Sequence, residues 1–276
     1  MKNLFRIFIV NLILSLGVFL NASILTEKVE TIIGTNDYKI HKSLIELLFK
    51  DESQFISRGN IRYLKFFKTL QENGLLNLHL DKPSDVKIEF ISLNNHFKSY
   101  KILNDTMQVI GYRYFFTKAM KIDEEDKLIW DIELKAEYMI DPVVLLDELR
   151  KNNCQVNHVE SIDFHQWSYE VDCQNARLSN AIEIEKNEKV KFQKPLRAYL
   201  LSVENGKSLQ VISRNLNNWF PHIVFFNKDL QVLQVIKRDR MYKGLTIKIP
   251  NDTRYVKITD MYNLINIKRG LSIIVR

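Results

Sequence analysis

The chain of 276 residues lacks the short motifs that mark several large enzyme classes. It contains no H-E-x-x-H zinc helix, no G-x-S-x-G nucleophile elbow, no P-loop and no G-x-G-x-x-G fingerprint. The six histidines are scattered, and none lies three or four residues from another. The 33 acidic residues could supply a carboxylate pair for glycoside hydrolysis, but spacing alone selects no pair. We therefore expect no catalytic residue, no metal and no cofactor, with an enzyme of unknown class as the alternative.

Glycine and proline are also scarce, at eight and five residues, whereas Phe, Ile, Leu, Asn and Lys are abundant. This bias is typical of an AT-rich bacterial genome. After the first 22 residues there is no apolar run long enough to span a bilayer, which takes about 20 residues. The remaining length is enough for two small domains, and we expect a soluble, exported protein.

The first 22 residues have the pattern of a secretory signal peptide. Lys2 and Arg6 precede an apolar run at residues 7–20, and we place cleavage after Ala22. The alternative is an uncleaved N-terminal anchor, which would be the protein's contact with a membrane. No cysteine lies near this boundary, so a lipoprotein is not expected. Signal and composition together predict a periplasmic location, and export disfavours nucleic acid as a partner.

The chain has two cysteines, Cys154 and Cys173. An even number of cysteines in an oxidising compartment indicates one disulfide bond. A metal pair or two free thiols are the alternatives. A metal is disfavoured because there is no second cysteine pair and because His158 and His165 lack ligand spacing. We predict a disulfide that joins a helix end to the strand packed beneath it.

Basic residues are in only slight excess over acidic residues. The formal net charge is +7, or +5 without Lys2 and Arg6. We interpret this as a mild excess spread along a solvated surface, with contact to an acidic polymer as the alternative. Four adjacent acids at residues 123–126 lack the order and the central glycine of a calcium loop, so we expect a solvated hairpin tip there.

Residues 128–138 are the clearest element. Every second residue from Leu128 is apolar, and from Asp131 on the residues between them are charged. Side chains alternate along a strand, so this strand has one buried and one wet face. Trp130 is expected in the core beneath two helices, and Glu133 is expected on the wet face.

Around this strand, the order is strand, helix, strand, strand, helix, strand and a final hairpin. Asn94 or Asn95 starts the first helix, and Asp141-Pro142 is a cap followed by proline at the first helical position. The order resembles the ferredoxin-like plan, with two helices over one face of an antiparallel sheet.

Two amphipathic helices are expected before this domain. The first follows Asn36-Asp37 with an apolar face that includes Ile40 and Leu47, and the second covers residues 60–73. Residues 23–34 have no definite pattern. We interpret the two helices as a packed layer; a partner-binding pair that uses the aromatic cluster near Phe66 is the alternative.

Beyond a charged connection, seven short strands are separated by turn signals such as Asn205-Gly206 and Arg269-Gly270. This spacing predicts a β-sandwich. The fold class is therefore α+β, with a ferredoxin-like domain preceded by helices and followed by an all-β sandwich. The expected boundaries are 1–22 for the signal peptide, 23–80 for the helical segment, 81–176 for the ferredoxin-like domain, 177–195 for the linker and 196–276 for the sandwich.

Small exported α+β domains with this element order resemble the ring-building and alignment domains of bacterial envelope machines, which include secretion systems, pili and flagellar motors. The sandwich is similar to the accessory modules of many exported bacterial proteins. Both resemblances rest on element order, so no residue role is carried over. They imply a structural or accessory component of an envelope or flagellar assembly.

The surface best suited to recognition is expected on the sandwich. Aromatic platforms with polar partners suit glycans or peptide chains. The selected residues are Trp219, Phe220, Tyr242, Arg240 and Arg254. Residues 219–221 are expected to be the most exposed group; the alternative is that the aromatics form the sandwich core. We predict a non-catalytic periplasmic protein with protein partners in the cell envelope. The alternative is a carbohydrate- or peptidoglycan-binding protein with cell-wall glycan as its ligand.

Overall fold

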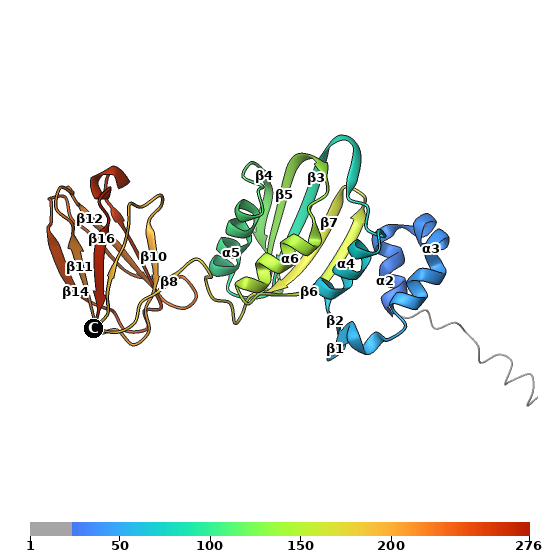
Figure 1. Cartoon of the computed structure of the whole chain (residues 1–276), viewed down its shortest axis with the longest axis horizontal. Helices are drawn as coiled ribbons and strands as arrows, with labels where there is room; N and C mark the ends of the chain where they lie inside the picture. Colours follow the sequence, from blue (N-terminus) through green and yellow to red (C-terminus); the bar gives the residue numbers. More distant parts are fainter. Residues whose placement is uncertain (1–23) are drawn as a thin grey trace, which may run out of the picture.

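The computed structural model describes residues 24–276, and the expected signal peptide lies outside the described residues. The described chain is elongated. A helical N-terminal part, a five-stranded sheet with its helices, and an all-β part follow one another along its length (Figure 1). The fold class is α+β, as the sequence predicts.

The N-terminal part contains more helix than the sequence pattern indicates. Residues 24–33 form a helix whose apolar side, including Val29, is buried. The following helix forms where it is expected, but Ile45 is its buried residue, whereas Ile40 and Leu47 are exposed. The periodicity of the sequence located this helix but did not predict which of its apolar residues are buried. The elements are α2 (Ile24–Ile33), α3 (Thr35–Leu48), η1 (Glu52–Gln54), β1 (Ile56–Ser57), β2 (Asn60–Ile61) and α4 (Tyr63–Glu72).

Helix α4 packs its aromatic residues inward. Tyr63, Phe66 and Phe67 are buried, and the ring centroid of Phe67 lies 5.8 Å from that of Trp167 in the sheet. The aromatic cluster therefore belongs to the core and is not an exposed partner-binding face.

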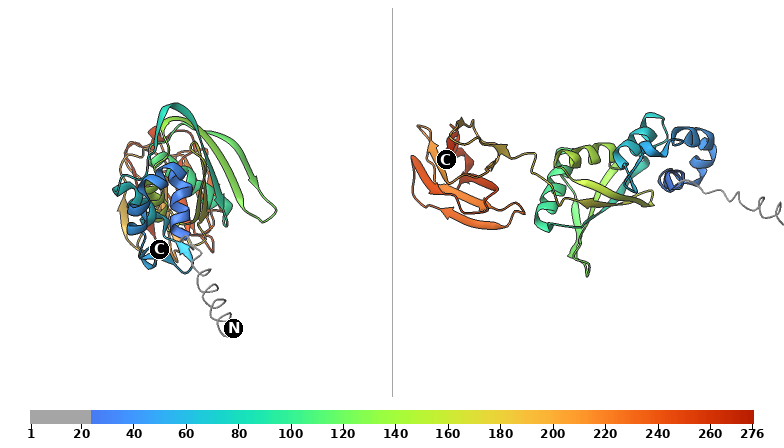
Figure 2. Two further views of the ribbon diagram at one scale, coloured as in Figure 1. Left: turned by 90° about the vertical axis from the view of Figure 1, so that its right-hand side faces the viewer. Right: turned by 90° about the horizontal axis from the view of Figure 1, so that it is seen from below.

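The middle sheet has the strand order β4-β5-β3-β7-β6. Helices cover one side of it, and the other side is open (Figure 2, right). The first half follows the expected order, because β3 pairs with β5 and β5 pairs with β4, both antiparallel. The elements are β3 (His79–Ser92), α5 (His96–Val109), β4 (Phe116–Ile122), β5 (Leu128–Tyr138), α6 (Pro142–Lys151), β6 (Gln155–Asp163) and β7 (Gln166–Asp172).

The second half of this sheet departs from the antiparallel ferredoxin-like plan. Strand β7 pairs with β3 in the parallel sense, and β6 forms the outer edge. The short turn between β6 and β7 makes these two strands antiparallel. In the ferredoxin-like plan, a single final strand would lie beside β3 and run antiparallel to it. Here β7 takes that place and runs parallel to β3. The expectation of a wholly antiparallel sheet is wrong.

Trp130 is buried near the start of β5, as the alternating pattern predicts. Its ring stacks on Phe90 at 5.6 Å between centroids and meets the edge of Tyr100 from α5 at 5.0 Å. The indole Nε1 donates a hydrogen bond to Thr117 Oγ1 at 3.1 Å, so its polar atom is satisfied inside the core.

Helix α6 begins and ends as the sequence predicts. Asp141 Oδ1 accepts hydrogen bonds from the backbone N–H groups of Val143 and Val144, at 2.8 and 3.3 Å. Cys154 follows the helix and forms a disulfide with Cys173 at the end of β7, with both residues buried. The predicted disulfide is confirmed, and it ties the end of α6 to the strand beneath it.

The last part is a two-sheet sandwich, with orders β13-β12-β15-β10-β8 and β14-β11-β16-β9 around one apolar core. The charged connection at residues 177–195 itself contributes β8 and β9. The elements are β8 (Ile182–Glu183), β9 (Lys189–Lys191), β10 (Tyr199–Ser202), β11 (Ser208–Ser213), β12 (Pro221–Phe226), β13 (Val232–Lys237), β14 (Gly244–Lys248), β15 (Tyr255–Asp260), η2 (Leu264–Ile267) and β16 (Leu271–Val275).

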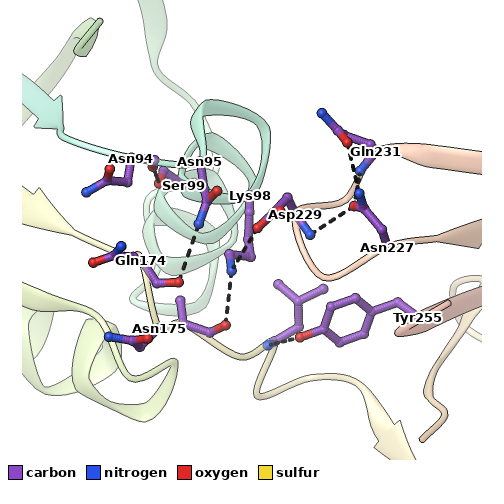
Figure 3. Close-up of polar contacts among 12 residues, drawn as sticks. Asn94, Asn95, Lys98, Ser99, Gln174, Asn175, Asn227, Asp229, Gln231 and Tyr255 are labelled. Atoms are coloured by element: carbon purple, nitrogen blue, oxygen red, sulfur yellow. Dashed lines mark hydrogen bonds and ion pairs between the residues drawn. The ribbon is translucent and has the colours of Figure 1, made fainter. Parts of the chain in front are cut away.

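The sandwich meets the middle domain through the loop between β12 and β13 (Figure 3). Lys98 of α5 is buried; its Nζ lies 3.8 Å from Asp229 Oδ1 and donates to the Ala176 carbonyl at 3.3 Å. Asn227 Oδ1 accepts from the Asp229 N–H at 2.9 Å, which orders the loop. Burial, followed by the nearby Lys228 charge, holds the pKa of Lys98 below its usual value, against the pull of Asp229.

Candidate interaction surface

Three loops meet at one end of the sandwich, around η2, the red helical turn in Figure 1. They are residues 214–220, 238–243 and 261–270, and we call this surface the η2 end. It lies at the start of β12, whereas the loop that reaches the middle domain follows the end of β12. The surface is therefore free of the domain contact.

Backbone hydrogen bonds hold the three loops together. The N–H of Asn218 donates to the Asn266 carbonyl, the N–H of Tyr242 to the Trp219 carbonyl, and the N–H of Met261 to the Phe220 carbonyl. These bonds are 2.8–2.9 Å long. They make one continuous surface from three segments that are separate in the sequence.

Two buried polar side chains order the loops from beneath. Asp260 accepts hydrogen bonds from the backbone N–H groups of Phe220, Tyr262 and Asn263 at 2.7–3.0 Å. Asn217 donates to the Gly270 carbonyl at 2.8 Å, and its Oδ1 accepts from the Arg269 N–H. The backbone of the η2 end is therefore held by satisfied, buried groups.

Large apolar side chains stand exposed on this ordered backbone. Leu216, Tyr262 and Ile265 have exposed fractions of 76%, 62% and 64%. Leu216 also has a φ of 67°, a left-handed conformation that is rare for a bulky residue. The exposed apolar residues at the η2 end are Leu216, Met241, Met261, Tyr262 and Ile265.

Basic residues accompany the apolar ones. The three loops contain six Lys and Arg and a single exposed acid, Asp239. Residues 196–276 contain 14 basic and five acidic residues, whereas residues 81–176 contain 11 basic and 18 acidic residues. The charge is thus segregated between the two domains, and our interpretation of an even spread is wrong. An electropositive end of this kind attracts acidic surfaces.

The structure corrects the selected recognition residues. Trp219 is buried, and its Nε1 donates to the Thr259 carbonyl at 3.0 Å, so it belongs to the sandwich core and not to the surface. Phe220 is half-buried and packs edge-on against Tyr262, with centroids 5.0 Å apart. Proximity to Pro221 and to a strand start did not distinguish an exposed tryptophan from a core one.

Of the remaining selected residues, Arg240 and Tyr242 lie at the η2 end. The Arg240 Cζ is 5.7 Å from the Tyr242 ring centroid. Arg254 lies at the opposite end of the sandwich, where it pairs with Glu204. Sequence reasoning missed Leu216 and Ile265. The signal for Leu216 was an apolar residue among the polar residues 214–218, whereas Ile265 lies in a loop with several other apolar residues and had no such signal.

A second polar surface lies on the open face of the middle sheet. Glu89 and Asp131 are directly opposite each other on β3 and β5. Ser168 donates a hydrogen bond to Glu89 at 2.9 Å. Burial, and then the Glu89 charge, raises the pKa of Asp131, against the pull of Lys121. Paired carboxylates of this kind occur in catalytic sites and in structural networks alike.

Within residues 24–276, no helix has both the length and the apolarity needed to cross a bilayer. In the same described part of the chain, no three His, Cys, Asp or Glu side chains gather in a way that could hold a metal ion.

No protein-family model and no curated protein matches the sequence. Among solved structures, the chain is similar to PliG of Aeromonas hydrophila, a periplasmic lysozyme inhibitor of g-type lysozyme. The identity is 15% and the TM-score 0.23, over 35% of this chain and 96% of that one. A TM-score this low supports no inference about the fold or the function of this chain.

Proposed function

We propose that this chain is an exported, non-catalytic protein that acts through protein–protein contact, with the η2 end as its docking surface. The observation that carries the proposal is the combination of exposed apolar residues, six basic residues and one acid on a single ordered surface. Aromatic residues, Met and Arg are typical of protein interfaces. The complementary partner is a protein with an acidic rim around an apolar recess.

The order of this surface favours a protein partner over a lipid surface. Asp260 and Asn217 hold the loop backbones before any partner arrives. A surface ordered in advance loses little entropy on binding, which benefits a partner of fixed complementary shape. A fluid bilayer has no such shape to match.

The disulfide supports export, because such bonds persist in oxidising compartments. We propose the periplasm as the compartment and an envelope or flagellar assembly as the setting. Glycan binding is the other function to be tested. Because Trp219 is buried, the largest aromatic side chain near the η2 end cannot stack on a sugar ring. Tyr262 is the exposed aromatic residue of the η2 end.

The test begins with a photo-reactive phenylalanine analogue in place of Tyr262, expressed in cells. A matched position is Tyr114, an exposed tyrosine of the middle domain. We expect one envelope protein to be cross-linked from position 262 and not from position 114. Cross-links that join only copies of this chain would contradict the proposal.

The cross-linked protein is then purified and titrated with the wild-type chain. Leu216→Ser and Arg240→Glu should each weaken binding about tenfold or more, as central interface residues do. Lys207→Glu, at the other end of β11, should leave the affinity unchanged. Equal losses in all three variants would contradict the proposal. So would pelleting with peptidoglycan or anionic vesicles that Leu216→Ser abolishes, because it would assign the surface to glycan or lipid.

A further inference from the structure

A pocket lies far from the sandwich, beside the disulfide, where the β1–β2 hairpin, the start of α4 and the end of α6 meet. Its volume is about 440 Å³. Three arginines line it, Arg58, Arg62 and Arg150, and no acidic residue does. The residues that line the pocket therefore carry a net positive charge.

Two of these guanidinium groups are uncompensated. Arg150 pairs with Asp147 at 2.8 Å, but neither Arg58 nor Arg62 makes an ion pair with another residue of the described chain. Helix α4 adds to the positive field, because no side chain caps its N-terminus and its first turn contains no acid. An anion in this pocket would give Arg58 and Arg62 an ion-pair partner.

Arg58 is held in an unusual backbone conformation. Its φ is 51° and that of Gly59 is 81°, as a two-residue turn of type I′ requires. Asn or Gly ordinarily occupies the first position of such a turn, and arginine does so rarely. A residue held in a conformation that its type seldom adopts is a candidate for a functional side chain.

The rest of the pocket wall is partly apolar. Ile61, Leu64, Leu146 and Val156 contribute to it, beside the buried Cys154. The guanidinium fork matches a carboxylate through two parallel hydrogen bonds. We propose that this pocket binds a carboxylate that carries an adjacent apolar group. Both the C-terminus of a polypeptide that ends in an aliphatic residue and a free small acid have this chemistry. The inference does not depend on the function of the η2 end.

The test is a ¹H–¹⁵N NMR titration of the folded protein with N-acetyl-leucine and with its neutral amide. We expect saturable shifts for amides of residues 57–64 and 146–157 with the acid, and about tenfold weaker binding of the amide, as expected for loss of a charge-assisted contact. Arg58→Asn and Arg62→Gln should each weaken binding of the acid about tenfold. Asn suits the type I′ turn, so Arg58→Asn should keep or raise the Tm.

The matched control is Lys68→Gln, which removes one positive charge from an exposed position of α4 outside the pocket. It should bind N-acetyl-leucine as the wild type does. Equal affinity for the acid and its amide, or an equal loss in Lys68→Gln, would overturn the proposal. A tripeptide that ends in leucine separates the two sources: tighter binding than N-acetyl-leucine indicates a polypeptide C-terminus, and equal binding indicates a small free acid.

Discussion

Asp131 is a residue that the fold tolerates at a cost in stability. It faces Glu89 across two strands, and its pKa is raised by burial and by that neighbouring charge. Like charges directly opposite in a sheet are destabilising. We predict that Asp131→Asn raises the free energy of unfolding at pH 7 by roughly 0.2–1 kcal/mol, the size of a cross-strand pair. Urea unfolding of both proteins would measure the difference.

The pH dependence tests the cause of this effect. A carboxyl whose pKa is higher in the folded state binds its proton more tightly there. The stability it contributes is therefore complete below its usual pKa of 3.8 and is lost as the pH rises through the folded value. The gain from Asp131→Asn should disappear below pH 3.8. Glu133→Gln is the control on the same face: Glu133 pairs with Lys118, so its loss should bring no gain. A gain that persists unchanged in acid would exclude charge repulsion as the cause.

At the scale of elements, the disulfide connects α6 to β7 across 19 residues of sequence. Closing a loop of this length limits the unfolded chain, which is worth about 3 kcal/mol in the chain-entropy model. We predict that the Cys154→Ala, Cys173→Ala double variant loses about this much stability. Guanidinium unfolding with and without reductant would measure it. Reductant should lower the stability of the wild type and leave the variant unchanged; equal stability of the oxidised wild type and the variant would refute the role of the bond.

Helices α3 and α6 show how far the periodicity of a sequence predicts the buried face of a helix. For α6, the Asp141-Pro142 start and the buried face with Leu145 and Leu149 both agree with the sequence. For α3, the same kind of pattern located the helix but not its buried side. The difference is that α6 contacts α4, α5 and β6, whereas α3 contacts mainly α2. A helix with one main neighbour has fewer side chains to cover its apolar residues.

At the scale of the whole molecule, the Lys98–Asp229 contact joins the two large domains. Asp229→Asn would remove the carboxylate charge that faces the buried Lys98 ammonium and leave it with its hydrogen bond to the Ala176 carbonyl. We predict that this variant destabilises the domain contact by about 1–3 kcal/mol, the usual result of an unsatisfied buried group. Hydrogen exchange of residues 98–103 and 227–231 should become faster.

A second substitution separates charge from packing at this contact. Lys98→Met in the Asp229→Asn background removes the unpaired charge and keeps a long apolar side chain. Replacing both partners of a buried pair is often neutral. Protection from exchange should therefore return toward that of the wild type. If Asp229→Asn alone exchanges like the wild type, this contact does not hold the domains together.

The sequence by itself determined the elements whose signals are local. The alternation of β5, the cap of α6, the sandwich strands and the pairing of two lone cysteines all follow from patterns within a few residues or from simple counting. Only the tertiary structure decided how the elements combine. The parallel insertion of β7 beside β3, the burial of Trp219 and the meeting of three loops at the η2 end depend on contacts between distant segments. The pocket of Arg58, Arg62 and Arg150 does so too, because its third arginine comes from a helix about 90 residues further along the chain. Local propensity determines what a segment becomes, whereas long-range packing determines what lies next to it.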